Sequence, residues 1–496
     1  MIELELTVVV GFIATAATLY ILAKWTNVLC RKKYPPGPWG FPILGHLPML
    51  GTKPEVTYQQ WRELYGDVFR IRFGSWKCVI INGYDAVKDA AERSDDAFSG
   101  RPNFVTNISL KEAYGGFQSL SFTDMSPKYL QLRKLTATAL SNYTRTCDYK
   151  PEDLFTSEAE RLVDSMDDQS FLVSHNVEIA VENVVYQMLY GRGTEGEIRP
   201  HVKLIVEASN AFVKFVSTGN IVDVVPWLRY VMKGKVEDFK KAATATDWIT
   251  RSKIDEHKKS FEKGQTRDIL DSFCALSNEL PSKETEDSIS GDHLMFQATA
   301  VQGAGFETMS QTLKNIILYM SAFPDIQTRV QQEIDDVIGN RPVKWTDRLN
   351  LPYVNATIQE VMRISLATPF ALPHLTVVDT KLRHYDIDKG TVVFFNLHSV
   401  ANEDSFWGDP TVFRPERFLN DNGGLDAGKC AHVLAFGIGR RKCVGEALAR
   451  MNIFIAFTIL MQRRKFSCTE PEHLKHNLID GNTTEEQCKI IVQRRT

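Results

Sequence analysis

The chain has 496 residues, of which 43% are hydrophobic and 24% charged, and its formal net charge is -3. This composition excludes a disordered chain and provides enough apolar side chains for a large core. The near-neutral charge gives no reason to expect nucleic acid as a partner. The eight cysteines include no Cys-x-x-Cys pair, which indicates reduced thiols facing the cytosol rather than a disulfide scaffold.

The N-terminal segment predicts a membrane anchor. Residues 6–23 contain no charged side chain, and this length is close to the roughly 20 apolar residues that span a bilayer. Glu3 and Glu5 precede the segment and no obvious cleavage site follows it, so a retained anchor is favoured over a cleaved signal peptide. Basic residues on its C-terminal side place the main body in the cytosol. Residues 1–33 are therefore expected to be a single-pass anchor with a basic flank, in the endoplasmic reticulum membrane.

The next segment, residues 34–44, contains four prolines and is predicted to be a stiff, non-helical hinge. No internal repeat or second linker follows it, which favours one continuous domain over residues 45–496. Residues 68–73 and 78–81 are rich in β-branched and aromatic side chains and predict strands. Helical patterns dominate the remainder. The expected fold is therefore mainly α with a smaller β region.

The longest predicted helix covers residues 292–322 behind a possible cap at Ser290, and another covers residues 325–338. Inside the first, two glycines at positions 303 and 305 directly precede Glu307 and Thr308. Each interior glycine costs about 1 kcal/mol relative to alanine. Close packing against another helix is one explanation, and a helix opened toward a ligand and water is the other.

Near the C-terminus, one cysteine lies in a glycine-rich segment with the pattern Phe-x-x-Gly-x-Arg-x-Cys-x-Gly. Its residues include Phe436, Gly437, Gly439, Arg441, Cys443 and Gly445. A structural zinc site needs about four ligands, but one thiolate is enough for the fifth coordination position of a haem iron. The glycines let the main chain approach a flat macrocycle, and Arg441 offers a cation to a haem propionate. The alternative is a surface turn with an ordinary thiol.

This pattern resembles the cysteine loop of the cytochrome P450 superfamily, and the resemblance covers nearly the whole chain. Three other segments are similar to motifs of that family, namely Ala304-Gly305-x-Glu307-Thr308, Glu360-x-x-Arg363 and Pro415-Glu416-Arg417-Phe418. The resemblance implies the cytochrome P450 fold behind one transmembrane helix. It implies haem b as the cofactor, with Cys443 as its axial thiolate. It also implies a buried structural network of Glu360, Arg363 and Arg417.

The resemblance further assigns roles around the haem. Thr308 is expected to gate proton delivery during oxygen activation, and Glu307 to supply the protons. The expected propionate partners are Arg441, His374 and Arg133. Without the resemblance, a histidine beside a proline is more often a surface or packing residue. The remaining expected haem contacts are Phe436, Gly437, Gly445 and Ala304. Tyr129 occupies a position where the family has tryptophan, which leaves its contact with the propionate open.

The implied activity is a monooxygenase that uses O2 and NADPH-derived electrons on a lipophilic molecule. Residues 115–120, 219–226 and 303–306 are similar to the animal microsomal group of aryl hydrocarbon hydroxylases and steroid 17-hydroxylases. The expected substrate is therefore a xenobiotic aromatic compound or a steroid, in an apolar pocket. Two alternatives are a haem-thiolate isomerase or dehydratase acting on a peroxide, and a non-catalytic haem sensor. The acid-alcohol pair at positions 307 and 308 favours monooxygenation over both.

The resemblance implies NADPH-cytochrome P450 reductase as the electron donor and cytochrome b5 as a candidate second partner. A basic face near the cysteine would steer an acidic reductase. Its candidate residues are Lys128, Lys134, Arg440, Lys442 and Arg450. A solvated mixture of both charges is the alternative. The candidate pocket walls are residues 104–122, 212–222, 300–308, 371–372 and 479–483.

Overall fold

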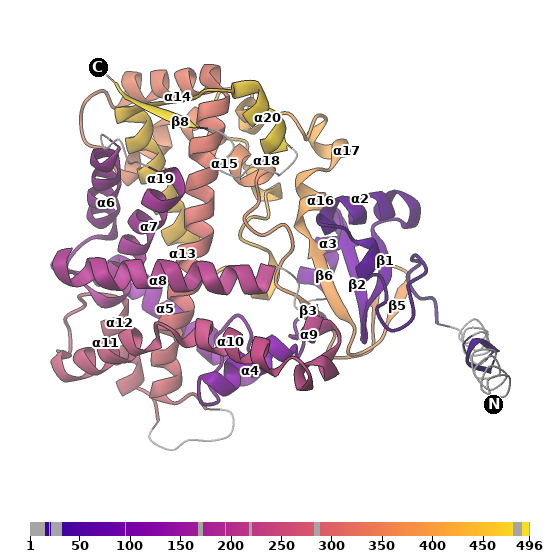
Figure 1. Ribbon diagram of the computed structural model, residues 1–496. Helices are drawn as coiled ribbons and strands as arrows, with labels where there is room; N and C mark the ends of the chain where they lie inside the picture. The colour runs from indigo at the N-terminus through magenta and orange to yellow at the C-terminus, as the bar shows by residue number, and fades with distance from the viewer. Residues whose placement is uncertain are drawn as a thin grey trace.

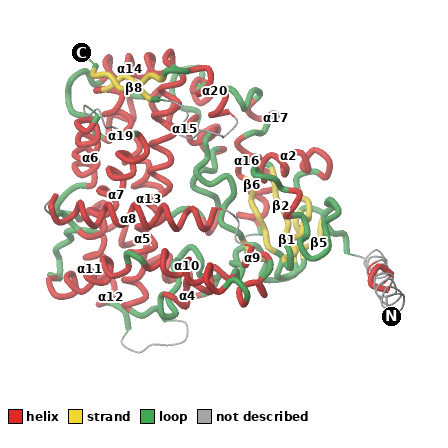
Figure 2. The backbone as a smooth tube through the Cα atoms, in the orientation of Figure 1, coloured by secondary structure: helices red, strands yellow, loops and turns green. Residues whose placement is uncertain are grey.

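The computed structural model describes residues 15–18, 20, 32–94, 96–166, 172–193, 195–217, 221–281, 288–479 and 489–495. Helices form most of this part, and the largest sheet lies at one side of the helical body (Figure 1). Figure 2 shows the same division, with strands gathered at the right and a small pair near the C-terminus. The predicted class, mainly α with a smaller β region, is confirmed.

The helices have the following bounds: α2 Pro54–Tyr65, α3 Tyr84–Lys88, α4 Val105–Ala113, α5 Pro127–Thr146, α6 Pro151–Ser165, α7 Val173–Tyr190, α8 Glu195–Ser217, α9 Ile221–Val224, α10 Lys233–Thr244, α11 Asp247–Ser260, α12 Ile269–Asn278, α13 Gly291–Ala322, α14 Pro324–Val337, α15 Pro352–Ile364, α16 Leu397–Ala401, α17 Asp404–Trp407, α18 Ala427–His432, α19 Glu446–Arg463 and α20 Pro471–Ile479.

The strands are β1 Val68–Phe73, β2 Trp76–Asn82, β3 His374–Leu375, β4 Thr380–Leu382, β5 Tyr385–Ile387, β6 Val392–Asn396, β7 Arg464–Cys468 and β8 Ile490–Arg494. The main sheet has the order β1-β2-β6-β3. Strand β1 pairs antiparallel with β2, and β2 pairs parallel with β6. The strand predicted at 68–73 matches β1, and the one predicted at 78–81 lies inside β2. The sheet therefore joins segments more than three hundred residues apart, and its strand β3, which contains His374, lies on the side of the helical body (Figure 1).

The proline-rich segment is not helical, as predicted, and it lies along the main sheet. The Arg70 amide donates to the Pro36 carbonyl at 2.8 Å. A side chain at Gly37 would collide with the Arg70 carbonyl, so glycine permits this approach. Just before the segment, Lys32 forms ion pairs with Asp379 at 3.2 Å and Asp388 at 3.0 Å. The predicted hinge is therefore held against the main body of the chain by these contacts.

The predicted anchor at 6–23 lies outside the described residues apart from 15–18 and 20, which are helical. Among the helices that the structure describes, none combines the length and the apolar character needed to cross a bilayer. The anchor therefore stays a prediction.

Helix α13 runs through the helical body, beside α7, α12 and α19 (Figure 1). Its N-cap is Ser290, whose hydroxyl accepts from the His293 amide, as the sequence predicts. The helix is continuous through both interior glycines, and Gly305 lines the cavity described below. A side chain at Gly303 would meet open space, and one at Gly305 would make ordinary contact with Val185. Close packing therefore does not require glycine at either position.

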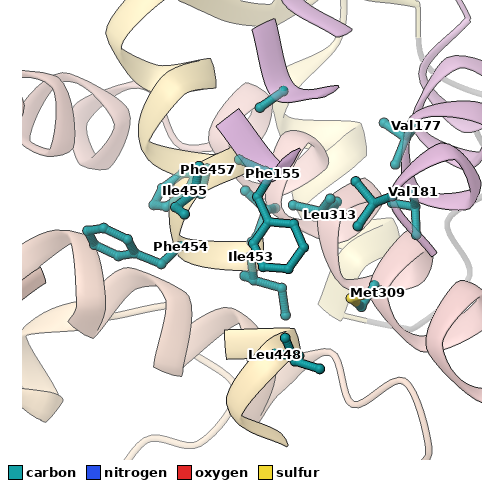
Figure 3. Packing of buried hydrophobic residues seen from close by; sticks show 14 of the residues in the cluster. Phe155, Val177, Val181, Met309, Leu313, Leu448, Ile453, Phe454, Ile455 and Phe457 are labelled. Atoms are coloured by element: carbon teal, nitrogen blue, oxygen red, sulfur yellow. The ribbon is translucent and has the colours of Figure 1, made fainter. Parts of the chain in front are cut away.

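The core behind the cysteine segment is built from α6, α7, α13 and α19. Figure 3 shows Phe155 of α6 and Leu313 of α13 packed with the side chains of Ile453 and Phe457 on α19. Burying each such side chain contributes about 1.5–3 kcal/mol. Ile453 and its neighbour Leu448 also line the cavity described below. The cavity is thus bounded by the main core.

The predicted network of Glu360, Arg363 and Arg417 is confirmed. Arg363 Nε lies 2.7 Å from Glu360 Oε2, and Arg417 Nε lies 3.0 Å from Glu360 Oε1. All three side chains are at most 3% exposed. Both guanidinium groups also donate to backbone carbonyls, including that of Ala401. The network joins α15 to the turn at Pro415–Phe418.

Candidate active site

A cavity of about 350 Å³ lies between α13, α5, the segment before β3 and the cysteine segment. Most of the predicted site residues line it, although they come from distant parts of the chain. They are Arg133, Ala304, Thr308, His374, Phe436, Gly437, Arg441, Cys443 and Gly445. Glu307 is the predicted site residue that does not line this cavity. The fold thus brings together residues that are up to about three hundred positions apart.

The cysteine segment is held in shape by its own backbone. The Cys443 amide donates to the Phe436 carbonyl at 2.9 Å, which closes the loop between them. Gly437 and Gly439 both have φ of 72°, a conformation that favours glycine. A side chain at Gly439 would also collide with the Ala91 carbonyl. The loop can therefore lie flat beside the cavity.

The Cys443 side chain is exposed and lines the cavity. Burial raises the pKa of the Cys443 thiol, while the backbone amides of Gly445 and Glu446 oppose that rise. These amides belong to the first turn of α19, where helix N–H groups favour negative charge. A metal-bound thiolate would have these donors near its sulfur.

Two arginines form a cationic edge of the cavity, and the second of them was not predicted. Arg441 donates to the Ser99 carbonyl at 2.7 Å and to the Thr123 carbonyl at 2.9 Å. Arg101 donates to the Ser121 carbonyl at 2.8 Å and to the carbonyls of residues 372 and 373. Within the described part of the chain, neither guanidinium forms an ion pair with a carboxylate.

The nearby charge of Asp124 offsets only part of the cost of this positive charge, because burial has the larger, opposite effect on the pKa of both arginines. Burial, followed by the charge of Arg441, lowers the pKa of Arg101 to about 9. Burial also lowers the pKa of Arg441. Removing a charge from water costs several kcal/mol, which is offset only by an opposite charge and hydrogen bonds. Two carboxylates entering the cavity would supply both, so the residues present fit the propionates of haem.

His374 is buried on the same edge. Its Nδ1 lies 2.7 Å from the Phe98 carbonyl, so Nδ1 carries the hydrogen. Burial, and then the charge of Arg101, hold the pKa of His374 well below its ordinary value. The neutral ring can only accept at Nε2. Donation from Nε2 to a propionate therefore requires the ring to take up a proton, which an adjacent anion would favour.

Helix α5 contributes the other two candidates. Arg133 donates to the Lys442 carbonyl at 2.6 Å and so ties the helix to the cysteine segment. Tyr129, which stands where the family has tryptophan, lies at the cavity wall. The Arg441 guanidinium lies over the Tyr129 ring, 3.9 Å from its centroid. The Tyr129 hydroxyl donates to the Arg440 carbonyl at 3.3 Å. In this structure Tyr129 therefore supports Arg441.

On the opposite wall, the Thr308 hydroxyl donates to the Ala304 carbonyl at 2.9 Å. Its lone pairs remain available to a donor in the cavity. Glu307 lies behind this wall. Burial raises the pKa of Glu307, and the charge of Lys314 opposes that effect. Lys314 itself pairs with Glu178 at 3.0 Å.

Comparison with known proteins agrees with this geometry. The family model described as Cytochrome P450 matches residues 35–488. The chain belongs to the cytochrome P450 family. Among curated relatives, cytochrome P450 1A1 of Felis catus is 34% identical over 91% of this chain and 89% of its own length. Cytochrome P450 1A1 of Homo sapiens is 33% identical over 95% of each chain. Cytochrome P450 1A1 of Cavia porcellus is 33% identical over 91% of this chain and 90% of its own length.

Membership of this family confirms the predicted enzyme class and the predicted cofactor. The protein is a cytochrome P450 monooxygenase, and its cofactor is haem with a cysteine thiolate as ligand of the iron. The predicted membership of the superfamily is confirmed over most of the chain. The fold is that of a cytochrome P450, as far as the described residues extend.

The predicted pocket walls are confirmed in part. Within 300–308, 371–372 and 104–122, the residues that line the cavity include Val301, Leu372 and Leu120. Residues 218–220 of the predicted wall at 212–222 lie outside the described residues, as do 480–483 of the wall at 479–483. The prediction missed Gln297, one turn before Val301 on α13, which also lines the cavity.

Proposed function

We propose that this cytochrome P450 uses O2 and NADPH-derived electrons to hydroxylate or epoxidise a lipophilic xenobiotic aromatic compound or steroid. One observation carries the proposal. Cys443 and Thr308 lie on the walls of one cavity, with a cationic edge that suits haem propionates. Most other lining side chains between these features are apolar, including Leu120 and Val301. Such a pocket favours a hydrophobic ligand.

The proposal assigns each site residue a task around the cofactor. Bound haem supplies the oxygen-activating chemistry. Cys443 would ligate the iron, while Phe436, Gly437, Gly445 and Ala304 would contact the macrocycle. Arg441, Arg133 and His374 would bind the propionates, and we add Arg101 to this set. The guanidinium groups would hold the cofactor by charge-assisted hydrogen bonds.

Protons would be delivered from the α13 wall. Thr308 can exchange its hydrogen bond to Ala304 for one directed into the cavity. Because burial raises its pKa, Glu307 holds a proton closer to neutral pH than an exposed glutamate does. Since Glu307 does not line the cavity, its role would be to replenish Thr308 rather than to contact substrate.

We further propose an anchor over residues 1–33, a hinge over 34–44 and a catalytic domain over 45–496, held at the endoplasmic reticulum membrane and facing the cytosol. NADPH-cytochrome P450 reductase would donate electrons at the cysteine side, and cytochrome b5 would be a second partner. The surface there mixes charges, as the alternative expected. Arg440 pairs with Asp96 at 2.6 Å, and Glu446 pairs with Lys442 at 2.7 Å and with Arg450 at 2.9 Å.

The test is the absorption spectrum of the reduced protein with carbon monoxide. The wild-type protein should give the band of a thiolate-ligated haem, and Cys443→Ser should abolish it. Cys430→Ser is the matched control, since Cys430 packs near the same core and does not line the cavity. Product formation should also require NADPH and reductase. Turnover of a peroxide without either would contradict the proposal and favour the isomerase or dehydratase alternative.

A further inference from the structure

Two buried side chains near the start of α13 hold one irregular segment against the cavity. Gln297 is fully buried and lines the cavity. Its Oε1 accepts from the Leu120 amide at 2.8 Å, and its Nε2 donates to the Gln118 carbonyl at 3.2 Å. One turn earlier, His293 Nε2 lies 2.9 Å from the same Gln118 carbonyl. We call Gln297 and His293 the α13 clamp.

The clamped segment forms part of the cavity wall. It begins after Gly115 and Gly116, whose φ values of 63° and 96° turn the chain away from α4. Leu120 and Ser121 then line the cavity. From the other side, Arg101 donates to the Ser121 carbonyl at 2.8 Å. The wall at 118–121 is therefore fixed at both ends, by α13 and by the cationic edge.

The chemistry of this clamp suits an amide. One side chain accepts from the Leu120 amide and donates to a backbone carbonyl two residues earlier, and the carboxamide of glutamine supplies a separate acceptor and donor for these two bonds. Because a carbonyl only accepts, His293 must carry its hydrogen on Nε2. Burial lowers the pKa of His293, which keeps the ring neutral in this arrangement. The ring is also stacked on Phe117, with centroids 5.3 Å apart.

We propose that Gln297 is a positioning residue that determines substrate fit, by fixing the wall at 118–121 over the cavity. The inference rests on the proposed function, because it treats this cavity as the substrate site. Displacement of Leu120 by about 1 Å would change both the size of ligand accepted and the carbon presented for oxidation. Gln297 acts through the wall and is not assigned contact with reacting atoms.

Hydrogen exchange tests the clamp directly. In Gln297→Met, a side chain of similar length, the Leu120 amide loses its acceptor and should exchange about fivefold faster or more. Gln331→Met is the matched control. Gln331 is a buried glutamine of α14 that donates to the Arg464 carbonyl at 2.9 Å, away from the cavity. It should leave exchange over 117–122 unchanged.

The second readout is selectivity. Spectral titration with naphthalene, phenanthrene and pyrene should show that Gln297→Met changes their relative affinities by about threefold or more. The ratio of products from phenanthrene should change as well, whereas Gln331→Met should alter neither. If Gln297→Met does not fold, Gln297→Asn is the second variant, because it keeps the amide but withdraws it by one methylene. It should change the exchange rate, the relative affinities and the product ratio in the same direction by smaller factors.

Unchanged exchange, relative affinities and product ratio in a folded Gln297 variant would overturn the inference. The carbon monoxide spectrum of the wild-type protein separates this failure from a failure of the proposed function. Without a thiolate-haem band the proposed function fails, while the exchange experiment still tests the clamp. With a normal band and unchanged selectivity, only the role of Gln297 is wrong.

Discussion

The molecule contains two arginine clusters with opposite electrostatic balance, one buried and one partly buried. In one, Arg363 and Arg417 share Glu360, so the positive charge has a carboxylate within the protein. In the other, Arg101 and Arg441 donate to backbone carbonyls, and no carboxylate of the described residues pairs with them. The first cluster lies inside the core, and the second faces a cavity. A buried arginine that pairs with a carboxylate of the protein thus has a structural role. An arginine at a cavity without such a pair indicates a binding site for an anionic ligand.

The first prediction concerns a substitution that disrupts the internal cluster. Glu360→Gln removes the charge that both guanidinium groups share, and should destabilise the fold by about 3–5 kcal/mol. This is a large part of the roughly 5–15 kcal/mol that stabilises a typical domain. Chemical denaturation should show the loss as an earlier transition or as a lack of folded protein.

Glu416→Gln is its control, because Glu416 pairs with the exposed Arg329 and does not join the buried network. Exposed pairs contribute about 1 kcal/mol or less. Equal denaturation midpoints for Glu360→Gln and Glu416→Gln would show that the shared carboxylate is not what holds the internal cluster.

The second prediction concerns the cluster at the cavity. Arg101→Met should accelerate transfer of haem from the holoprotein to an acceptor protein by about tenfold, because it removes a charge-assisted partner of a propionate. The comparison is with Arg341→Met, whose guanidinium pairs with Asp347 away from the cavity. If the two variants release haem at the same rate, Arg101 does not bind the cofactor.

The contrast between Arg441 and Arg101 shows how far sequence alone could predict the site. Arg441 stands two positions before Cys443, within a local pattern that resembles a known family. Arg101 acquires its role only when its segment meets Leu372 and the cysteine segment in space. No local sequence pattern predicts this contact. The general fold and the haem ligand were therefore predictable, whereas this part of the cationic edge was not.

The same limit applies to Glu307 and to the proline-rich segment. Spacing placed Glu307 beside Thr308 but could not show that its neighbour faces the cavity while Glu307 does not. The prolines predicted a stiff chain, yet the sequence did not show that it lies on β1. That arrangement depends on close approach at Gly37 to the Arg70 carbonyl, a contact with a partner 33 positions away.

The third prediction extends the comparison to a buried acid. Glu182 on α7 is fully buried and accepts from Gln302 Nε2 at 2.9 Å, and burial raises its pKa to about 8. Because the folded state binds this proton more tightly than the unfolded state, the stabilisation is complete below about pH 4.5 and is lost as the pH rises through about 8. Between these values the free energy of unfolding should fall by about 1 kcal/mol per pH unit.

Glu182→Gln replaces the neutral acid by a neutral amide and should remove this dependence. Denaturation of both proteins at several pH values measures the difference, since other titrating groups are common to them. The difference should favour the variant increasingly from pH 5 to pH 8, where the wild-type carboxyl approaches ionisation and no cation of the described residues pairs with it. Parallel stability curves would mean that Glu182 has a compensating partner. The contrast between paired and unpaired buried charge would then hold for the arginine clusters but not for this acid.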